Sequence, residues 1–246
     1  MGGRSAAMGK TSINQIDLWS AENNMGALAF YEESSIGAFY SNEYLSNDLA
    51  NKSVIGTYAL KKSAFGLSLS QFGYSQYQEN KVGLSYGMKL SDNFGVGAQL
   101  NYFNLKVGEG YGSRNTFTAK IGLYALINED LSVAATLSNP TRTELTDGGD
   151  DRLPTEIQLG LNYQFSKKLN TSIQVNKDID FDPIIHLGLE YHAIDILYLR
   201  AGIANKPTLS TFGFGLFLND FQLDFASSFD SNLGFSPMIS LAYTFD

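Results

Sequence analysis

Apolar and polar residues alternate almost without interruption from about residue 34 to the end of the chain. In the stretch 156–165, Ile157, Leu159, Leu161 and Tyr163 alternate with polar residues and a glycine. A period of two is the signature of a half-buried strand, whereas a helix would place apolar residues three and four positions apart. The pattern therefore predicts an all-β chain over this region.

The alternating stretches predict fourteen strands, most of them about nine to twelve residues long. This length exceeds the usual five to six residues of a strand in a soluble protein. It matches the nine to eleven residues with which a tilted strand crosses a bilayer. The predicted spans are 34–42, 53–60, 63–72, 80–90, 94–106, 115–127, 131–138, 154–165, 169–176, 184–192, 196–204, 209–218, 221–229 and 237–245.

The lengths of the connections also alternate. Those after even-numbered strands are very short, such as Lys61-Lys62 and Asn219-Asp220. Those after odd-numbered strands are mostly longer, and 43–52, 107–114 and 139–153 are the longest. Short turns at one end and longer loops at the other are typical of outer-membrane barrels, and an even strand count leaves both chain ends on the short-turn side, the periplasm.

The two faces of the predicted strands differ in composition. One face carries Phe, Leu, Ile, Val and Tyr, and the other carries Gly, Ser, Thr, Asn and Gln. Charged residues make up 17 % of the chain, and 24 residues are glycine. A weakly charged, glycine-rich polar face suits a lumen better than a solvated surface, although a soluble β-sandwich stays open as the alternative. The final strand, 237–245, ends on alternating apolar residues with Phe245 near its end, which resembles the signal read by the barrel-assembly machinery.

Charge and cysteine content exclude several classes of protein. A net charge of −8 and a pI near 4.8 argue against nucleic acid as a partner. The absence of cysteine excludes disulfides, thiolate metal sites and cysteine nucleophiles. No basic and apolar leader opens the chain, so we expect a processed form of a protein located in the bacterial outer membrane.

Residues 1–33 lack the alternation. A barrel of fourteen strands encloses more space than its own side chains fill, because about eight strands already close around a packed core. We therefore infer two parts: residues 1–33 form an N-terminal hatch inside the lumen, with a helical turn near Leu18–Glu22, and residues 34–246 form the transmembrane barrel. A disordered periplasmic tail is the alternative. Small residues on the lumen face would leave room for the hatch: Gly66, Gly83, Gly87, Gly95, Gly97, Gly122, Gly160, Gly188, Gly202, Gly213 and Gly215.

The first thirty residues resemble the opening of the PorV/PorQ family of Bacteroidota, within the wider FadL-like group of fourteen-stranded outer-membrane barrels. The resemblance rests on Gly2 or Gly3 with Arg4, Ala6 or Ala7, Met8 and Gly9, then on Asp17-Leu18-Trp19-Ser20, and more loosely on Asn24, Gly26 and Leu28, where the family's Pro is missing. In the family this opening lies inside the barrel. The resemblance thus implies hatch roles for Arg4, Met8, Gly9, Asp17, Trp19 and Asn24.

The resemblance implies two functions. FadL-type members take up hydrophobic compounds through a lateral opening, and PorV-type members are accessory subunits of type IX secretion. Because this chain lacks the long extracellular loops of FadL-type members, we expect a non-enzymatic accessory subunit of a larger outer-membrane complex in protein export or assembly. Its expected partners are that complex and the lipid bilayer. The alternative is a FadL-like channel for small hydrophobic molecules.

No catalytic motif, metal site or cofactor site is predicted. His186 and His192 share a face but stand roughly 20 Å apart at about 3.3 Å per residue, so they cannot hold one metal together. A lipid-hydrolase role for either histidine has no serine to support it. Two outer loops carry acidic clusters, Asp147, Asp150 and Asp151 in one and Asp178, Asp180 and Asp182 in the other. The alternate spacing of the second cluster could offer oxygen ligands to a hard cation such as calcium, but a solvated acidic loop is the better interpretation.

Seven ionisable residues fall on the predicted lumen face. They could line a selective pore, or they could form ion pairs that hold the hatch to the wall, for example with Arg4, Asp17 or Glu22. We favour the ion pairs, because a plugged lumen leaves little open path through the barrel. The seven residues are Lys81, Lys89, Lys120, Glu156, Glu190, Arg200 and Asp224.

Overall fold

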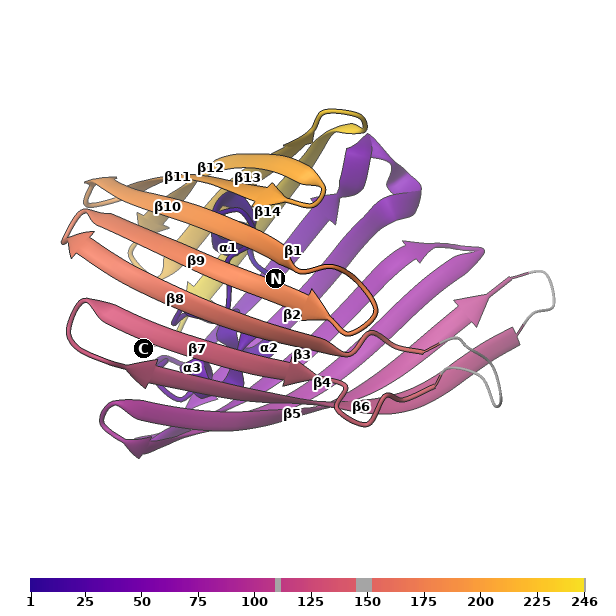
Figure 1. The fold of residues 1–246 in the computed structure, drawn as a ribbon, viewed down its shortest axis with the longest axis horizontal. Coiled ribbons are helices and arrows are strands. Elements are labelled where there is room, and N and C mark those ends of the chain that lie inside the picture. The colour runs from indigo at the N-terminus through magenta and orange to yellow at the C-terminus, as the bar shows by residue number, and fades with distance from the viewer. Residues whose placement is uncertain (109–111, 145–151, 246) are drawn as a thin grey trace.

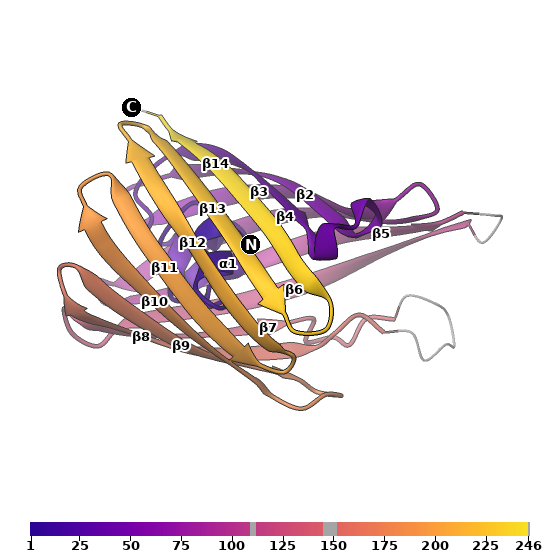
Figure 2. The same cartoon turned by 90° about the horizontal axis from the view of Figure 1, so that it is seen from above.

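The computed structural model describes residues 1–108, 112–144 and 152–245 and shows a closed barrel (Figures 1 and 2). All fourteen strands are antiparallel to their neighbours, and β1 pairs with β14 from Ser35↔Thr244 to Ser41↔Met238, which closes the sheet. The predicted fold class, a fourteen-stranded antiparallel transmembrane barrel, is confirmed.

The strands follow the predicted spans closely. Several are longer at their extracellular ends, because alternation there continues through Gln, Asn and Lys residues that the apolar pattern alone does not mark. The strands are β1 Ser35–Asn42, β2 Ala50–Ala59, β3 Ser63–Tyr74, β4 Tyr77–Ser91, β5 Phe94–Val107, β6 Gly112–Leu126, β7 Leu131–Ser138, β8 Glu156–Ser166, β9 Leu169–Asp178, β10 Ile184–Ile194, β11 Leu197–Asn205, β12 Thr208–Leu218, β13 Phe221–Asp230 and β14 Gly234–Thr244.

The helices of the described chain are short. Three lie in the N-terminal segment, which we define as residues 1–33: α1 Gly3–Ala7, α2 Ser20–Asn23 and α3 Met25–Leu28. Two single 3-10 turns, Glu43–Leu45 and Asn47–Leu49, join β1 to β2. No helix in the described part of the chain has the length and hydropathy to cross a membrane.

The outer face of the barrel is apolar over its middle. On β4, for example, Val82, Leu84, Tyr86, Met88 and Leu90 are all largely exposed while the residues between them point inward. A continuous apolar belt of this kind would be unfavourable in water, whereas contact with the hydrocarbon tails of lipids stabilises it. The barrel is therefore in contact with the lipid bilayer.

Aromatic side chains frame this apolar belt at both ends. At the short-turn end, Phe65 packs on Tyr86 with ring centroids 4.9 Å apart, and Phe221 packs on Tyr243 at 4.8 Å. At the long-loop end, Tyr102 packs on Phe117 at 5.4 Å, and Phe229 packs on Phe235 at 4.9 Å. Paired aromatic girdles of this kind lie at the two membrane–water interfaces of outer-membrane barrels.

The barrel rim is uneven. Strands β4, β5 and β6 have 15, 14 and 15 residues, whereas β1 and β7 have 8 each. At the end with the longer loops, the wall formed by these long strands extends further than the wall formed by the other strands. Figure 1 shows this extension at the right. Two connections at this end are as tight as the periplasmic turns, namely Ser75-Gln76 and Lys206-Pro207.

Candidate functional site

The lumen holds the N-terminal segment, whose indigo ribbon lies within the ring of strands in both overall views (Figures 1 and 2). Almost every residue from Gly2 to Ala29 is buried. Glycines of the wall lie directly against this segment, too close for any side chain between them. A Cβ added at Gly66 would lie 2.5 Å from the Cβ of Ala21, and one added at Gly87 would lie 2.1 Å from the carbonyl oxygen of Met25. The glycine face thus creates the space that the segment fills.

Gly9 shows how tightly the segment meets the wall. Its φ is +68°, and a Cβ would lie 2.4 Å from the carbonyl oxygen of Leu187. The backbone N–H of Gly9 donates to Oγ1 of Thr211 at 2.8 Å, and its carbonyl oxygen is 2.7 Å from Nδ1 of His186. Only glycine satisfies both the left-handed conformation and this close approach. Met8, which precedes it, is fully buried against Gly188 and Gly202.

Arg4 joins the segment to a buried chain of charges on the wall. Its Nε and Nη2 donate to the two carboxylate oxygens of Glu190 on β10, at 2.9 and 2.6 Å. Glu190 also accepts from Nε of Arg200 on β11 at 2.7 Å, and Arg200 donates to Asp224 on β13 at 2.6 Å. Within the N-terminal segment, Oδ2 of Asp17 lies 3.7 Å from Nη1 of Arg4. Bidentate arginine–carboxylate pairs are strong and directional, and each charge in this chain has an opposite charge beside it.

A second charged cluster surrounds Glu22 on the opposite wall. Its carboxylate pairs with Lys81 on β4 and accepts hydrogen bonds from Ser68 Oγ at 2.8 Å and Gln99 Nε2 at 3.1 Å. Lys120 on β6 donates to the carbonyl oxygen of Glu22 at 3.1 Å. Sequence reasoning named Glu22 only as an example of a pairing residue, because no local signal shows that one carboxylate meets three strands.

Asn24 fixes the turn between α2 and α3. Its Oδ1 accepts from the N–H of Gly26 at 2.9 Å, and its Nδ2 donates to the carbonyl oxygens of Ile13 and Leu123. Gly122 makes room for this side chain, since a Cβ there would lie 2.2 Å from Asn24 Oδ1. Asp17 acts similarly at the start of α2, where its Oδ1 accepts from the N–H of Trp19 at 2.9 Å.

Trp19 is the centre of an apolar cluster at the β13, β14, β1 and β2 side of the lumen. Its indole ring lies edge-on to Phe39 with centroids 6.1 Å apart, and both are buried with Ile55 and Met238. Polar lumen residues of the same strands, such as Ser53 and Ser240, surround this cluster. The interior therefore holds a local apolar cluster within a largely polar lumen.

The remaining predicted lumen residues lie near the two ends of the barrel. At the periplasmic end Lys89 pairs with Glu32 at 2.5 Å, and this ammonium group holds the pKa of the exposed Glu32 carboxyl below its ordinary value. Near the extracellular end Glu156 accepts a hydrogen bond from Gln158 at 2.9 Å. The structure thus brings Glu190, Arg200 and Asp224 together and joins Lys81 to Lys120 through Glu22, but it leaves Lys89 and Glu156 apart from both clusters.

The other candidate groups form no shared site. His192 stacks on Tyr198 with centroids 4.3 Å apart, while His186 contacts Gly9, so the histidines have separate partners. Asp182 pairs with Lys206 at 2.8 Å. In residues 1–108, 112–144 and 152–245 no group of three or more His, Asp or Glu side chains is arranged to hold a metal ion. Asp147, Asp150 and Asp151 lie outside the described residues.

Closure of the sheet, the apolar belt and the aromatic girdles define an integral β-barrel of the bacterial outer membrane. The chain is similar to the toluene transporter TbuX of Ralstonia pickettii, with a TM-score of 0.77, 14 % identity and coverage of 100 % of this chain and 98 % of that one. It is also similar to the toluene transporter TodX of Pseudomonas putida, with a TM-score of 0.75, 12 % identity and 99 % and 97 % coverage. A FadL homologue from Pseudomonas aeruginosa has a TM-score of 0.68 and 14 % identity over 100 % and 98 % of the two chains. The fold is thus the FadL-type barrel.

Sequence comparison adds nothing to this assignment, since no family model and no curated protein matches the chain. The structural neighbours correct one prediction. An accessory subunit of type IX secretion is the wrong interpretation, because TbuX and TodX, which share this fold over their whole length, are named as toluene transporters and nothing in these similarities points to secretion. The expected larger outer-membrane complex rested on the same interpretation and has no support in these similarities.

Proposed function

We propose that the protein is a non-enzymatic outer-membrane channel that admits small hydrophobic molecules. The observation that carries the proposal is the similarity of fold over the whole length of both chains to proteins named as toluene transporters. The narrower resemblance of the first thirty residues to the PorV/PorQ family of Bacteroidota stays a prediction and carries no function here.

The apolar cluster around Trp19 supports the same proposal. Trp19 of the N-terminal segment is buried together with Phe39, Ile55 and Met238 of the wall. A hydrophobic molecule that reached these side chains when the segment moves would lose no hydrogen bonds, whereas a sugar would leave polar groups unpaired there. The side chains therefore favour hydrophobic over polar solutes.

We further propose that residues 1–33 are the hatch of this channel and residues 34–246 its barrel. The segment fills the lumen and is tied to opposite walls through Arg4 and Glu22. Passage then requires part of the segment to move, because the wall is hydrogen-bonded around the whole ring. The hatch residues suggested by the sequence, such as Gly9 and Asn24, are those that lie against the wall.

Uptake by whole cells tests the function. The protein is produced in the outer membrane of a bacterium that lacks its own FadL-type protein, and uptake of radiolabelled toluene and of radiolabelled glucose is measured. We expect faster toluene uptake than in cells with the empty vector and unchanged glucose uptake. Equal rates with and without the protein, or a gain for glucose as large as for toluene, would contradict the proposal.

A reversible crosslink tests the hatch within the same assay. Asn14 Nδ2 lies 3.1 Å from Ser132 Oγ on β7, and the natural chain contains no cysteine to interfere. We expect Asn14→Cys/Ser132→Cys, joined by oxidation or a short bifunctional thiol reagent, to lose toluene uptake and to regain it on reduction. Ser132→Cys alone is the control. Undiminished uptake in fully crosslinked protein would show that this part of the segment does not move.

A further inference from the structure

A row of polar side chains crosses the outer face of six adjacent strands near the extracellular rim. Its members occupy paired positions on β1 to β6: Tyr40, Lys52, Gln71, Asn80, Asn104 and Asn115. They point outward, because they alternate with lumen residues and continue the exposed apolar positions Val54, Leu69 and Val82 one step further along each strand. We call these six residues the rim row.

The amides of the rim row bond to one another. Gln71 donates to Asn80 at 3.2 Å, Asn80 to Asn104 at 3.2 Å, and Asn104 to Asn115 at 2.7 Å. Primary amides cannot lie in hydrocarbon without a large desolvation cost, even when partly paired. The rim row therefore marks the level at which the hydrocarbon of the outer leaflet ends and the headgroups begin.

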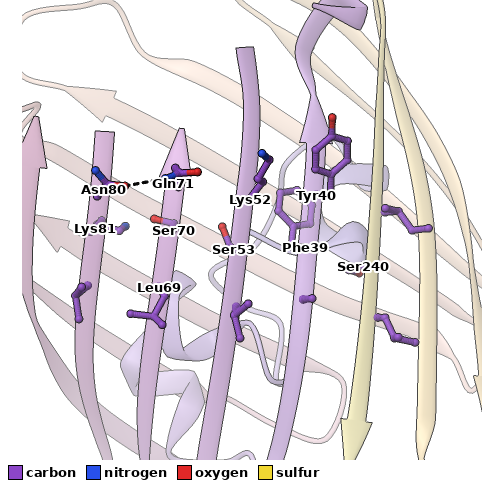
Figure 3. A pocket seen from close by; sticks show the side chains of 15 residues that line it. Phe39, Tyr40, Lys52, Ser53, Leu69, Ser70, Gln71, Asn80, Lys81 and Ser240 are labelled. Atoms are coloured by element: carbon purple, nitrogen blue, oxygen red, sulfur yellow. Dashed lines mark hydrogen bonds between the residues drawn. The ribbon is translucent and has the colours of Figure 1, made fainter. Parts of the chain in front are cut away.

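An open groove of about 660 Å³ lies directly below this row on β1, β2, β3, β4 and β14. Ala38 is a small residue at its floor, and Val54, Leu69, Val82 and Leu241 form its sides. Figure 3 shows Tyr40, Lys52, Gln71 and Asn80 across its upper edge, with Leu69 lower and the N-terminal segment behind the strands. The groove is thus apolar along its length and polar at its headgroup end.

Lys52 is the cation of the rim row. Its side chain is exposed, and no described carboxylate lies within ion-pair distance of it. Tyr40 is its paired neighbour on β1 and Gln71 its paired neighbour on β3. A lysine at this level has its stem against apolar side chains and its ammonium group among the headgroups, where it attracts negative charge.

We propose that the groove binds a phosphate-bearing lipid of the outer leaflet, with one acyl chain along Ala38 and the phosphate at Lys52 and Tyr40. The Tyr40 hydroxyl is a hydrogen-bond donor on the strand next to the ammonium group, so the rim offers a cation and a neutral donor to one anion. The groove faces the bilayer, so lipid is the molecule that surrounds it. This lipid site is independent of the transport proposed above and would exist in a barrel that carries nothing.

Native mass spectrometry of the full-length protein in nonionic detergent tests this site. Diphosphoryl lipid A is the anionic probe and phosphatidylcholine the zwitterionic one. We expect one lipid A to stay bound, with affinity at least fivefold above that for phosphatidylcholine, because one basic residue near anionic headgroups contributes about 1 kcal/mol. Equal binding of the two lipids, or a mass for a second copy of the chain in place of lipid, would overturn the proposal.

Matched variants locate the bound lipid. Lys52→Gln is expected to lower lipid A binding about fivefold, and Lys52→Arg to retain it. Ala38→Phe fills the floor of the groove, so it should abolish lipid A binding although Lys52 keeps its charge. The controls are Lys177→Gln, an outward lysine on β9, and Ala98→Phe, an outward alanine on β5, and both should bind as the natural chain does. Heat-modifiable gel migration verifies folding of each variant, and unchanged binding by folded Lys52→Gln would refute the site.

Discussion

Arg200 on β11 and Asp224 on β13 form an ion pair 2.6 Å long although strand β12 lies between them. Both side chains are buried, at 0 % and 1 % exposure. The strand between them presents Gly213 opposite Arg200 and Gly215 opposite Asp224, so no side chain stands in the way. A pair of glycines in one strand thus lets two other strands share a charge pair, and Glu190 extends the pair to Arg4 of the segment.

Gly215→Ala should therefore weaken the whole chain of charges. A Cβ at this position would lie 2.6 Å from both Arg200 Nη1 and Asp224 Oδ1, and buried charges that lose their partner destabilise a protein by about 3–5 kcal/mol. We expect the temperature at which folded-barrel gel migration is lost to fall. Gly56→Ala is the control, because the nearest atom to its Cβ is 3.9 Å away, and equal temperatures for the two variants would contradict the argument.

Deletion of residues 1–33 should open the barrel to ions. The intact protein is expected to show no large steady conductance in planar bilayers, because the segment fills the lumen. The deleted form should still fold, since its hydrogen-bonded wall is complete without the segment, and should conduct as wide barrels do. An intact protein that already conducts like an open porin, or a deletion that changes nothing, would show that the segment is not a plug.

Gly97→Leu should loosen the segment without removing it. A Cβ at Gly97 would already lie 2.5 Å from the Cβ of Met25, and the larger leucine cannot be accommodated while α3 stays in place. We expect intermittent conductance and faster proteolysis within residues 20–30. The control is Gly56→Leu, whose side chain points to lipid, and it should behave as the natural chain. Gly87→Leu should act like Gly97→Leu, because Met25 lies as close to it.

Glu22→Gln should release the segment from the β4–β6 side of the wall. The substitution leaves Lys81 without the carboxylate that pairs with it, while Lys120 keeps only its bond to the backbone carbonyl oxygen, and this loss should cost about 3–5 kcal/mol of docking. Hydrogen exchange of residues 20–28, followed by mass spectrometry, is expected to become faster, while exchange in the wall strands does not change. Asp182→Asn, which breaks an exposed pair with Lys206, is the control and should leave exchange in both regions unaltered.

Strand positions and barrel class were readable from the sequence because they depend on local periodicity. Each strand alternates lipid-facing and lumen-facing residues, so Val82, Leu84 and Tyr86 signal one strand without reference to any other. The sequence also placed Glu190, Arg200 and Asp224 on the lumen face by parity. The alternation of faces could not show that these side chains are in contact, because the contact depends on the register between β10, β11, β12 and β13.

Only the tertiary structure decided what those residues meet. Glu22 contacts Ser68, Lys81 and Gln99 because the register of β3, β4 and β5 places their lumen-facing side chains around one point of the segment. The secretion interpretation likewise could be overturned only by the shape of the whole barrel, because the N-terminal residues that suggested it are a small part of the fold shared with TbuX and TodX. Periodicity is a property of neighbours along the chain, whereas the lumen and the lipid-facing groove arise from side chains that are far apart in sequence.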